Sequence, residues 1–104
     1  MIARIWHGAT RPEKADSYLD YLSRTGLPDY KRTSGNLGAY VMRNVENGLT
    51  HFLTLSFWDS YDAVKRFAGN NYEISKHCPE DADFLIELET TVQHFEVFDR
   101  IETP

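Results

Sequence analysis

The chain has 104 residues, 41% of them hydrophobic and 26% charged, which indicates one globular domain over residues 1–104 with a modest core. Its net charge of −5 would repel phosphate backbones, so nucleic acid is not expected as a partner. No apolar stretch approaches the roughly 20 residues that span a bilayer, and the first residues do not resemble a signal peptide. Because Cys78 is the only cysteine, no internal disulfide is possible, and we expect a cytoplasmic protein.

The first third of the chain is predicted to form a strand followed by a helix. Residues 2–10 are rich in apolar and β-prone side chains, which favours a strand. The hydroxyl of Thr10 and the carboxylate of Glu13 have the spacing of a capping box, with Pro12 near the first helical turn. The helix is predicted to end or bend at Gly26 and Pro28.

The middle of the chain predicts a β-hairpin. Residues 36–46 and 49–58 have strand-like patterns and are joined by Asn47-Gly48, a dipeptide that suits the positive φ values of a type I′ turn. A second helix is expected after a cap at Asp59 or Ser60 and before Gly69.

Two further elements are predicted in the last third of the chain. Residues 79–87 have the apolar spacing of a short third helix, and residues 92–101 form the last predicted strand. Strand, helix, hairpin, helix and strand in this order indicate an α+β fold of the ferredoxin-like β-α-β-β-α-β type, with an antiparallel sheet whose first and third strands are central.

Strand alternation divides the side chains of the sheet into two sets. We predict that the helices cover an aliphatic set: Ala3, Ile5, Leu53, Leu55, Phe57, Phe95 and Val97. The opposite face would then carry an aromatic and polar set: Arg4, Trp6, Tyr40, Met42, Phe52, Thr54, Ser56, Trp58, His94 and Glu96. Because so many exposed rings usually mark an interface or a ligand site, we expect a second copy of the chain to cover this face as a homodimer and to enclose a ring-lined cavity.

The chain resembles the antibiotic biosynthesis monooxygenase family of dimeric α+β barrels over nearly its whole length. The resemblance rests on residues 1–8 (MIARIWHG), on residues 57–60 (FWDS) leading into Ala63-Val64 and residues 67–69 (FAG), and on residues 94–97 (HFEV). It implies a dimeric barrel. It also implies a choice among cofactor-free oxygenases of aromatic compounds, quinol oxygenases, heme-degrading enzymes and proteins of other roles.

Two candidate catalytic residues lie on the predicted cavity face. His94 could act as a general base or hold a phenolate, because histidine ordinarily titrates near neutral pH. The alternative is a histidine that only pairs with a neighbouring strand or with the second subunit. Arg4 could orient the substrate ring, or it could form a structural ion pair with Glu96 on an adjacent strand.

His77 is the candidate heme ligand, because the resemblance places it where heme-degrading relatives have their iron-binding histidine. Phe67 and His7 stand where those relatives have tryptophan and asparagine, which argues against heme cleavage. His77 is otherwise an ordinary polar connector residue. His7 is expected to be a satisfied, partly buried histidine facing the helices. The four histidines show no metal-binding spacing, so no metal and no resident cofactor are expected.

The remaining predicted substrate-binding residues are aromatic: Trp6, Tyr40, Phe52, Trp58 and Tyr72. The leading hypothesis is cofactor-independent oxygenation of a small phenol or quinol, in which the substrate supplies the electrons. The alternatives are a non-catalytic dimeric module that binds a small ligand or responds to stress, and a heme-degrading enzyme.

Overall fold

The computed structural model describes residues 1–75 and 79–102 and has the α+β ferredoxin-like fold. The elements in chain order are β1 (Ile2–Thr10), the 3₁₀ turn η1 (Pro12–Lys14), α1 (Ala15–Arg24), α2 (Gly26–Arg32), β2 (Asn36–Glu46), β3 (Leu49–Trp58), α3 (Tyr61–Ala68), η2 (Pro79–Asp83), β4 (Leu85–Leu88) and β5 (Gln93–Glu96). Among these described residues, no helix is both long and apolar enough to cross a membrane.

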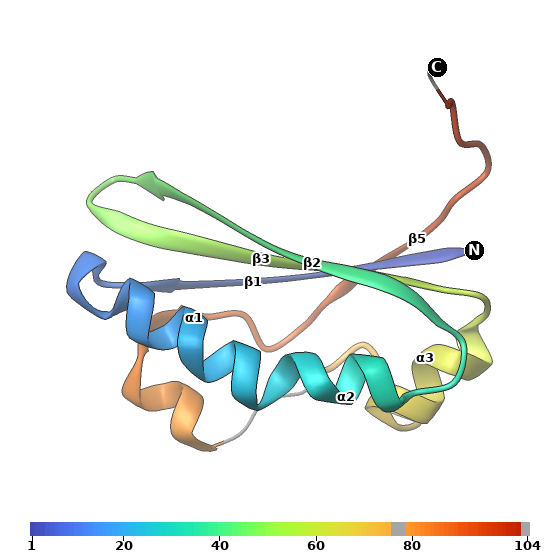
Figure 1. Cartoon of the computed structure of the whole chain (residues 1–104), viewed down its shortest axis with the longest axis horizontal. Helices are drawn as coiled ribbons and strands as arrows, with labels where there is room; N and C mark the ends of the chain where they lie inside the picture. The colour runs from blue at the N-terminus through green and yellow to red at the C-terminus, as the bar shows by residue number, and fades with distance from the viewer. Residues whose placement is uncertain (76–78, 103–104) are drawn as a thin grey trace.

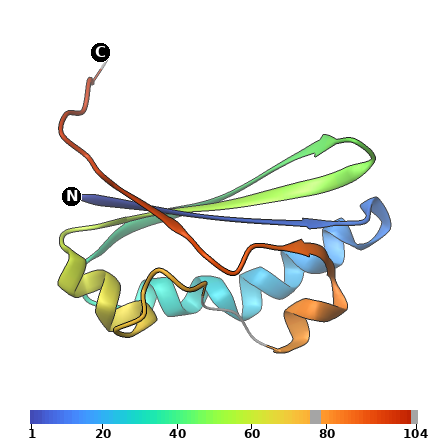
Figure 2. The ribbon, with the colours of Figure 1, turned by 180° about the vertical axis from the view of Figure 1, so that it is seen from behind.

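The sheet is antiparallel, and β1 and β3 lie at its centre as predicted. Strand β2 pairs with β3, and the other edge of β1 is shared by two short strands. Strand β5 pairs with residues 2–5 of β1, and β4 pairs with residues 8–10. All three α-helices cover one face of this sheet, so the other face is open in the single chain (Figures 1 and 2).

Local sequence signals account for the hairpin and the last helix. Asn47 and Gly48 have φ values of 54° and 76°, which confirms the predicted positive-φ turn between β2 and β3. The Ser60 hydroxyl accepts a hydrogen bond from the Ala63 amide at 3.2 Å and caps α3 as predicted. Gly69 ends that helix with a φ of 86°.

Three element predictions were wrong in detail. Thr10 does not form a capping box, because its hydroxyl donates to the Arg11 carbonyl and the chain enters α1 through η1. Residues 79–87 do not form a helix. A 3₁₀ turn is followed there by β4, because the free edge of β1 offers backbone partners that outweigh the local helical pattern. The last strand spans residues 93–96 rather than 92–101.

The predicted assignment of the two sheet faces was reversed for β1, β3 and β5, whereas Tyr40 and Met42 of β2 lie on the open face as predicted. Arg4, Phe52 and Trp58 face the helices and are almost fully buried, whereas Leu53 and Phe95 are exposed on the open face. Alternation along a strand separates two sets of side chains, but it does not say which set the helices cover or how β2 is registered against β3. The polar groups of the inner set find partners inside the protein: Trp58 Nε1, for example, donates to Ser56 Oγ at 2.9 Å.

Two clusters of buried side chains hold the helices on the sheet. One comprises Ile2, Trp58, Ala63 and Val64, and the other comprises Ala15, Tyr18, Tyr21 and Phe52. Tyr30 and Phe67 pack against the first cluster, and Trp6 and Leu22 pack against the second. These four residues also line a cavity between the sheet and the helices, so the cavity lies where the two clusters meet.

Candidate functional site

The cavity between the sheet and the helices has a volume of about 120 Å³. Strands β1, β2 and β3 contribute the side chains of one wall: Arg4, Trp6, Val41 and Thr54. The residues from α1 to α2, with one each from α3 and η2, form the opposite wall: Tyr18, Tyr21, Leu22, Thr25, Gly26, Leu27, Asp29, Tyr30, Phe67 and Asp81. A ring-lined space with a few polar groups has the composition of a small-molecule site.

Arg4 is the cation of this cavity. Arg4 is only 3% exposed to solvent. The Nη1 atom lies 2.9 Å from His94 Nε2 and also donates to the Tyr72 carbonyl. The guanidinium carbon lies 5.7 Å from the centre of the Phe67 ring, within cation–π range. Burial lowers the pKa of Arg4, and the nearby Tyr30 hydroxyl opposes this effect.

His94 contacts Arg4 on the side away from the cavity and is not a lining residue. Because arginine can only donate, His94 Nε2 must accept the hydrogen bond and the ring must be neutral. Burial, and after it the charge of Arg4, lower the pKa of His94 to about 4. The structure therefore gives His94 a positioning contact with Arg4 and makes the ring a weak base at neutral pH.

The predicted ion pair between Arg4 and Glu96 is not formed. Arg4 lies opposite His94 in the β1–β5 register, and Glu96 lies opposite Ile2. The ring of His94 also makes an edge-on contact with Tyr72, with centroids 5.3 Å apart. The expected neighbour on the adjacent strand is thus replaced by the histidine two residues earlier.

Tyr30 is the main residue of the site that sequence reasoning missed. Its ring stacks on Phe67 with centroids 4.6 Å apart. Burial raises the pKa of Tyr30, with a smaller opposite effect from Arg4, so the hydroxyl keeps its proton at neutral pH. The helical turn after Gly26 places this ring at the cavity, although the sequence there predicts only the end of a helix.

The predicted aromatic wall is only partly assembled. Trp6 lines the cavity, and Tyr72 lies next to Arg4 and His94. Phe52 and Trp58 are fully buried in the two core clusters and are not among the lining residues. Tyr40 pairs with Leu55 on the open face and is 62% exposed, so the structure does not bring it to the cavity. His77 lies outside the described residues.

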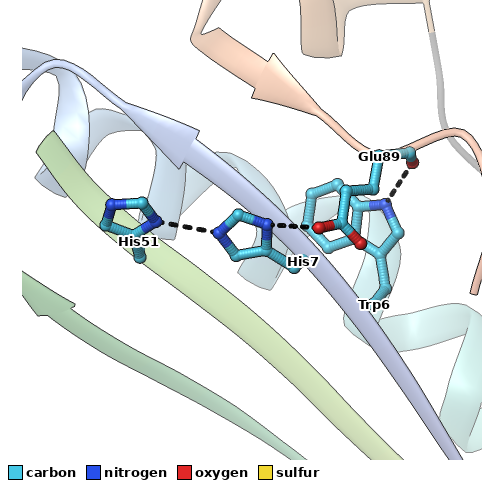
Figure 3. Close-up of polar contacts among 4 residues, drawn as sticks. All are labelled: Trp6, His7, His51 and Glu89. Carbon is cyan, nitrogen blue, oxygen red and sulfur yellow. Dashed lines mark hydrogen bonds and ion pairs between the residues drawn. The ribbon is translucent and has the colours of Figure 1, made fainter. Parts of the chain in front are cut away.

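A second polar constellation lies on the open face, where the predicted orientation of His7 towards the helices was wrong. His7 Nε2 lies 2.8 Å from His51 Nδ1, and His7 Nδ1 lies 2.9 Å from the Glu89 carboxylate (Figure 3). His7, His51 and Glu87 each offer a ligand atom within 4.8 Å of the others. No sequence spacing indicates this cluster, because strand pairing brings its members together.

The glycine between these two regions has a steric role. A Cβ atom on Gly8 would lie 2.5 Å from the six-membered ring of Trp6. Trp6 Nε1 donates to the Glu89 carbonyl at 3.0 Å (Figure 3), and this hydrogen bond holds the indole beside Gly8. Only a residue without a side chain leaves this space to the indole.

Several solved structures share this architecture over nearly the whole chain. A putative antibiotic biosynthesis monooxygenase from Bacillus cereus superposes with a TM-score of 0.70 at 13% identity, covering 99% of this chain and 96% of that one. The heme-degrading protein MhuD from Mycobacterium tuberculosis, with two hemes in its active site, superposes with a TM-score of 0.61 at 16% identity over 98% and 100% of the two chains. This chain has the fold of these two proteins.

The predicted ferredoxin-like fold is therefore confirmed by whole-length superposition. Another structure named antibiotic biosynthesis monooxygenase superposes with a TM-score of 0.65 at 18% identity over 95% of this chain and 100% of that one. No protein-family model and no curated protein sequence matches the chain. At these identities the likeness concerns the fold, and an activity has to be argued from the residues of the cavity.

Proposed function

We propose that this protein is a cofactor-independent monooxygenase of the antibiotic biosynthesis type, which oxidises a single-ring phenol or quinol in the cavity between sheet and helices. The observation that supports this most is a buried cation, Arg4, facing a ring-lined space. Within the described residues, Arg4 has no carboxylate within ion-pair distance. A bound phenolate would supply the missing negative charge.

The chemistry follows from this charge. A cation in a site of low dielectric favours the ionised form of a bound phenol, so Arg4 would lower the pKa of the substrate. The electron-rich phenolate then reacts with oxygen: a phenol and O₂ give a p-quinone and water, with one oxygen atom entering the ring. The substrate supplies all four electrons, so no resident cofactor is required. The phenolic proton has to leave the cavity. The carboxylates of Asp29 and Asp81 line this cavity.

In this proposal the residues have separate roles. Arg4 binds the phenolate oxygen, and His94 positions Arg4 through the 2.9 Å hydrogen bond. Trp6, Tyr30 and Phe67 enclose the ring, and the Tyr30 hydroxyl can donate to a second oxygen of the substrate. His94 is therefore assigned to positioning rather than to proton abstraction, because its Nε2 atom is already engaged with Arg4.

The size of the cavity favours a single ring over heme. A volume of about 120 Å³ lies below the roughly 300–1,000 Å³ of pockets that enclose drug-sized ligands. The macrocycle of heme is larger still and would require the helices to move away from the sheet. The two hemes of MhuD belong to that protein.

We further propose a homodimer that uses the open face of the sheet. Tyr40, Met42, Leu53 and Phe95 are exposed on this face, where Met42 lies opposite Leu53 and Phe95 lies opposite Ala3. Residues 97–102 run away from the sheet on this same side and carry Phe98 and Ile101, which are 90% and 88% exposed (Figure 1). A second copy would bury both features at once.

Oxygen uptake with a panel of phenols and hydroquinones, without added cofactor, tests the activity. Arg4→Met keeps much of the volume but removes the charge, and we expect kcat/KM to fall about 10²–10³-fold, as when one oxyanion partner is lost. Tyr40→Phe on the open face is the matched control and should keep the wild-type rate. No uptake with any compound, or a wild-type rate for Arg4→Met, would contradict the proposal. A hemin Soret shift abolished by His77→Ala would favour the heme alternative.

A further inference from the structure

The open face carries a second site whose residues come from three strands. His51 of β3 and Glu87 of β4 both lie opposite Ala9 of β1 in the strand registers. His7 lies two residues before Ala9 and therefore points to the same face of the sheet. The sheet thus places the two imidazoles and one carboxylate around a common point, with all ligand atoms within 4.8 Å of one another.

The outer hydrogen bonds fix how the two imidazoles face each other. The Glu89 carboxylate accepts from His7 Nδ1 at 2.9 Å, which leaves the lone pair of a neutral His7 on Nε2. The Glu46 carbonyl can only accept, and it lies 3.2 Å from His51 Nε2. That contact places the His51 hydrogen on Nε2 and the lone pair on Nδ1.

The inner nitrogens of His7 and His51 are 2.8 Å apart. With both hydrogens on the outer nitrogens, two lone pairs face each other across this distance, and the contact is repulsive unless a positive ion lies between them. That ion is either an additional proton or a metal. The Glu87 carboxylate beside the gap can supply a third ligand to a metal, whereas a proton shared by two nitrogens needs none.

We propose that His7 Nε2, His51 Nδ1 and the Glu87 carboxylate bind one divalent transition metal of the zinc class. Two histidines, one glutamate and an open fourth position for water form a recurrent set of zinc ligands. Glu89 holds His7 as carboxylates commonly hold metal-binding histidines, through the other ring nitrogen.

Binding requires the two rings to move apart and the Glu87 carboxylate, now within 4.8 Å of the nitrogens, to come to bonding distance of the metal. Zinc–nitrogen bonds of about 2.0–2.1 Å at a tetrahedral angle place the two nitrogens about 3.3 Å apart, so the rings must separate by about 0.5 Å. In the single chain His7 and His51 are partly exposed and Glu87 is exposed, which leaves room for this movement. Arg43 lines the adjoining groove, but its charge is paired with Asp16 at 2.8 Å.

Calorimetric titration of the chelator-treated protein with zinc chloride tests the site. We expect about one zinc ion per chain in the wild type and a loss of at least tenfold in affinity for His51→Ala and for Glu87→Gln. Glu89→Gln should bind about 10–100-fold more weakly, because it removes only the support of His7. His94→Gln, which alters a histidine on the other face of the sheet, is the matched control and should bind as the wild type.

Copper provides a second readout of the ligands. Electron paramagnetic resonance of the Cu²⁺ form should show coupling to two imidazole nitrogens in the wild type and to one in His51→Ala. Far-ultraviolet circular dichroism verifies that the variants are folded. Zinc binding that survives both His51→Ala and Glu87→Gln, or that is lost in His77→Ala instead, would overturn the proposal. Absence of any zinc binding by the wild type would also overturn it. The inference does not rest on the proposed oxygenase activity.

Discussion

The hydrogen bond between His94 and Arg4 predicts how stability depends on pH. The pKa of His94 falls from an ordinary value of 6.5 to about 4 in the folded chain, because burial and the charge of Arg4 disfavour the imidazolium. In the unfolded chain the ring takes up a proton below pH 6.5, whereas in the folded chain it does so only near pH 4. Between these values the unfolded state binds more protons, so the free energy of unfolding falls as the pH falls.

The size of this loss in the free energy of unfolding follows from the two pKa values of His94. At about pH 5 the difference in protonation is worth about 2 kcal/mol, and at about pH 7.5 it is close to zero. His94 is only half-buried, so solvent screening reduces the expected contribution to about 1 kcal/mol. His94→Gln keeps an oxygen that can accept from Arg4 but removes the titration.

Urea unfolding of the wild type and of His94→Gln at both pH values measures this difference. The wild type should lose about 1 kcal/mol more than the variant between about pH 7.5 and pH 5, with unchanged m values. Because other histidines and the carboxylates titrate equally in both proteins, they cancel in the comparison. Equal losses in the two proteins would show that His94 is not held neutral by Arg4, and the positioning role would fail.

Four further substitutions test packing, capping, the cavity and the open face. Phe52→Ala empties a fully buried position and should lower the free energy of unfolding by about 3–5 kcal/mol in urea unfolding, whereas a loss below about 1 kcal/mol would contradict the packing described. Ser60→Ala removes the cap of α3 and should cost about 1 kcal/mol in the same assay, and no change would mean that the hydroxyl does not cap the helix. Gly8→Ala should push the Trp6 ring aside, cost about 1–3 kcal/mol and change the tryptophan fluorescence, and an unaltered spectrum would refute the contact. Leu53→Glu should convert a dimer into a monomer in light scattering, and a dimer that survives would place the interface elsewhere.

Local signals predicted β1, the hairpin and α3 well, because the residues that carry them act on their own backbone. Asn47-Gly48 needs no distant partner to favour its turn, and the Ser60 hydroxyl caps a helix three residues away. The assignment of the two faces failed for the opposite reason. Both faces of β1 carry large apolar side chains, Ile5 on one and Trp6 on the other, so alternation alone could not decide which face the helices cover.

The candidate site was predictable in part. Arg4 and Trp6 were identified from their strand and do line the cavity, whereas Tyr30 enters it through a helix whose sequence indicates only an end. Strand β4 depends on the free edge of β1, a partner more than 70 residues away in the chain. The cluster of His7 and His51 likewise has no signature in the sequence, because its geometry exists only once three strands have paired.

The shared edge of β1 also determines when the cavity can form. Arg4 and His94 are separated by 90 positions, and the pairing of β1 with β5 closes the longest loop of the fold. Such non-local pairing is slow, and on a ribosome the partner of Arg4 emerges 90 residues after Arg4. The contact between Arg4 and His94 can therefore form only after these 90 residues have been made. Because β4 and β5 have only four residues each, their amides should also be the first of the sheet to exchange with solvent.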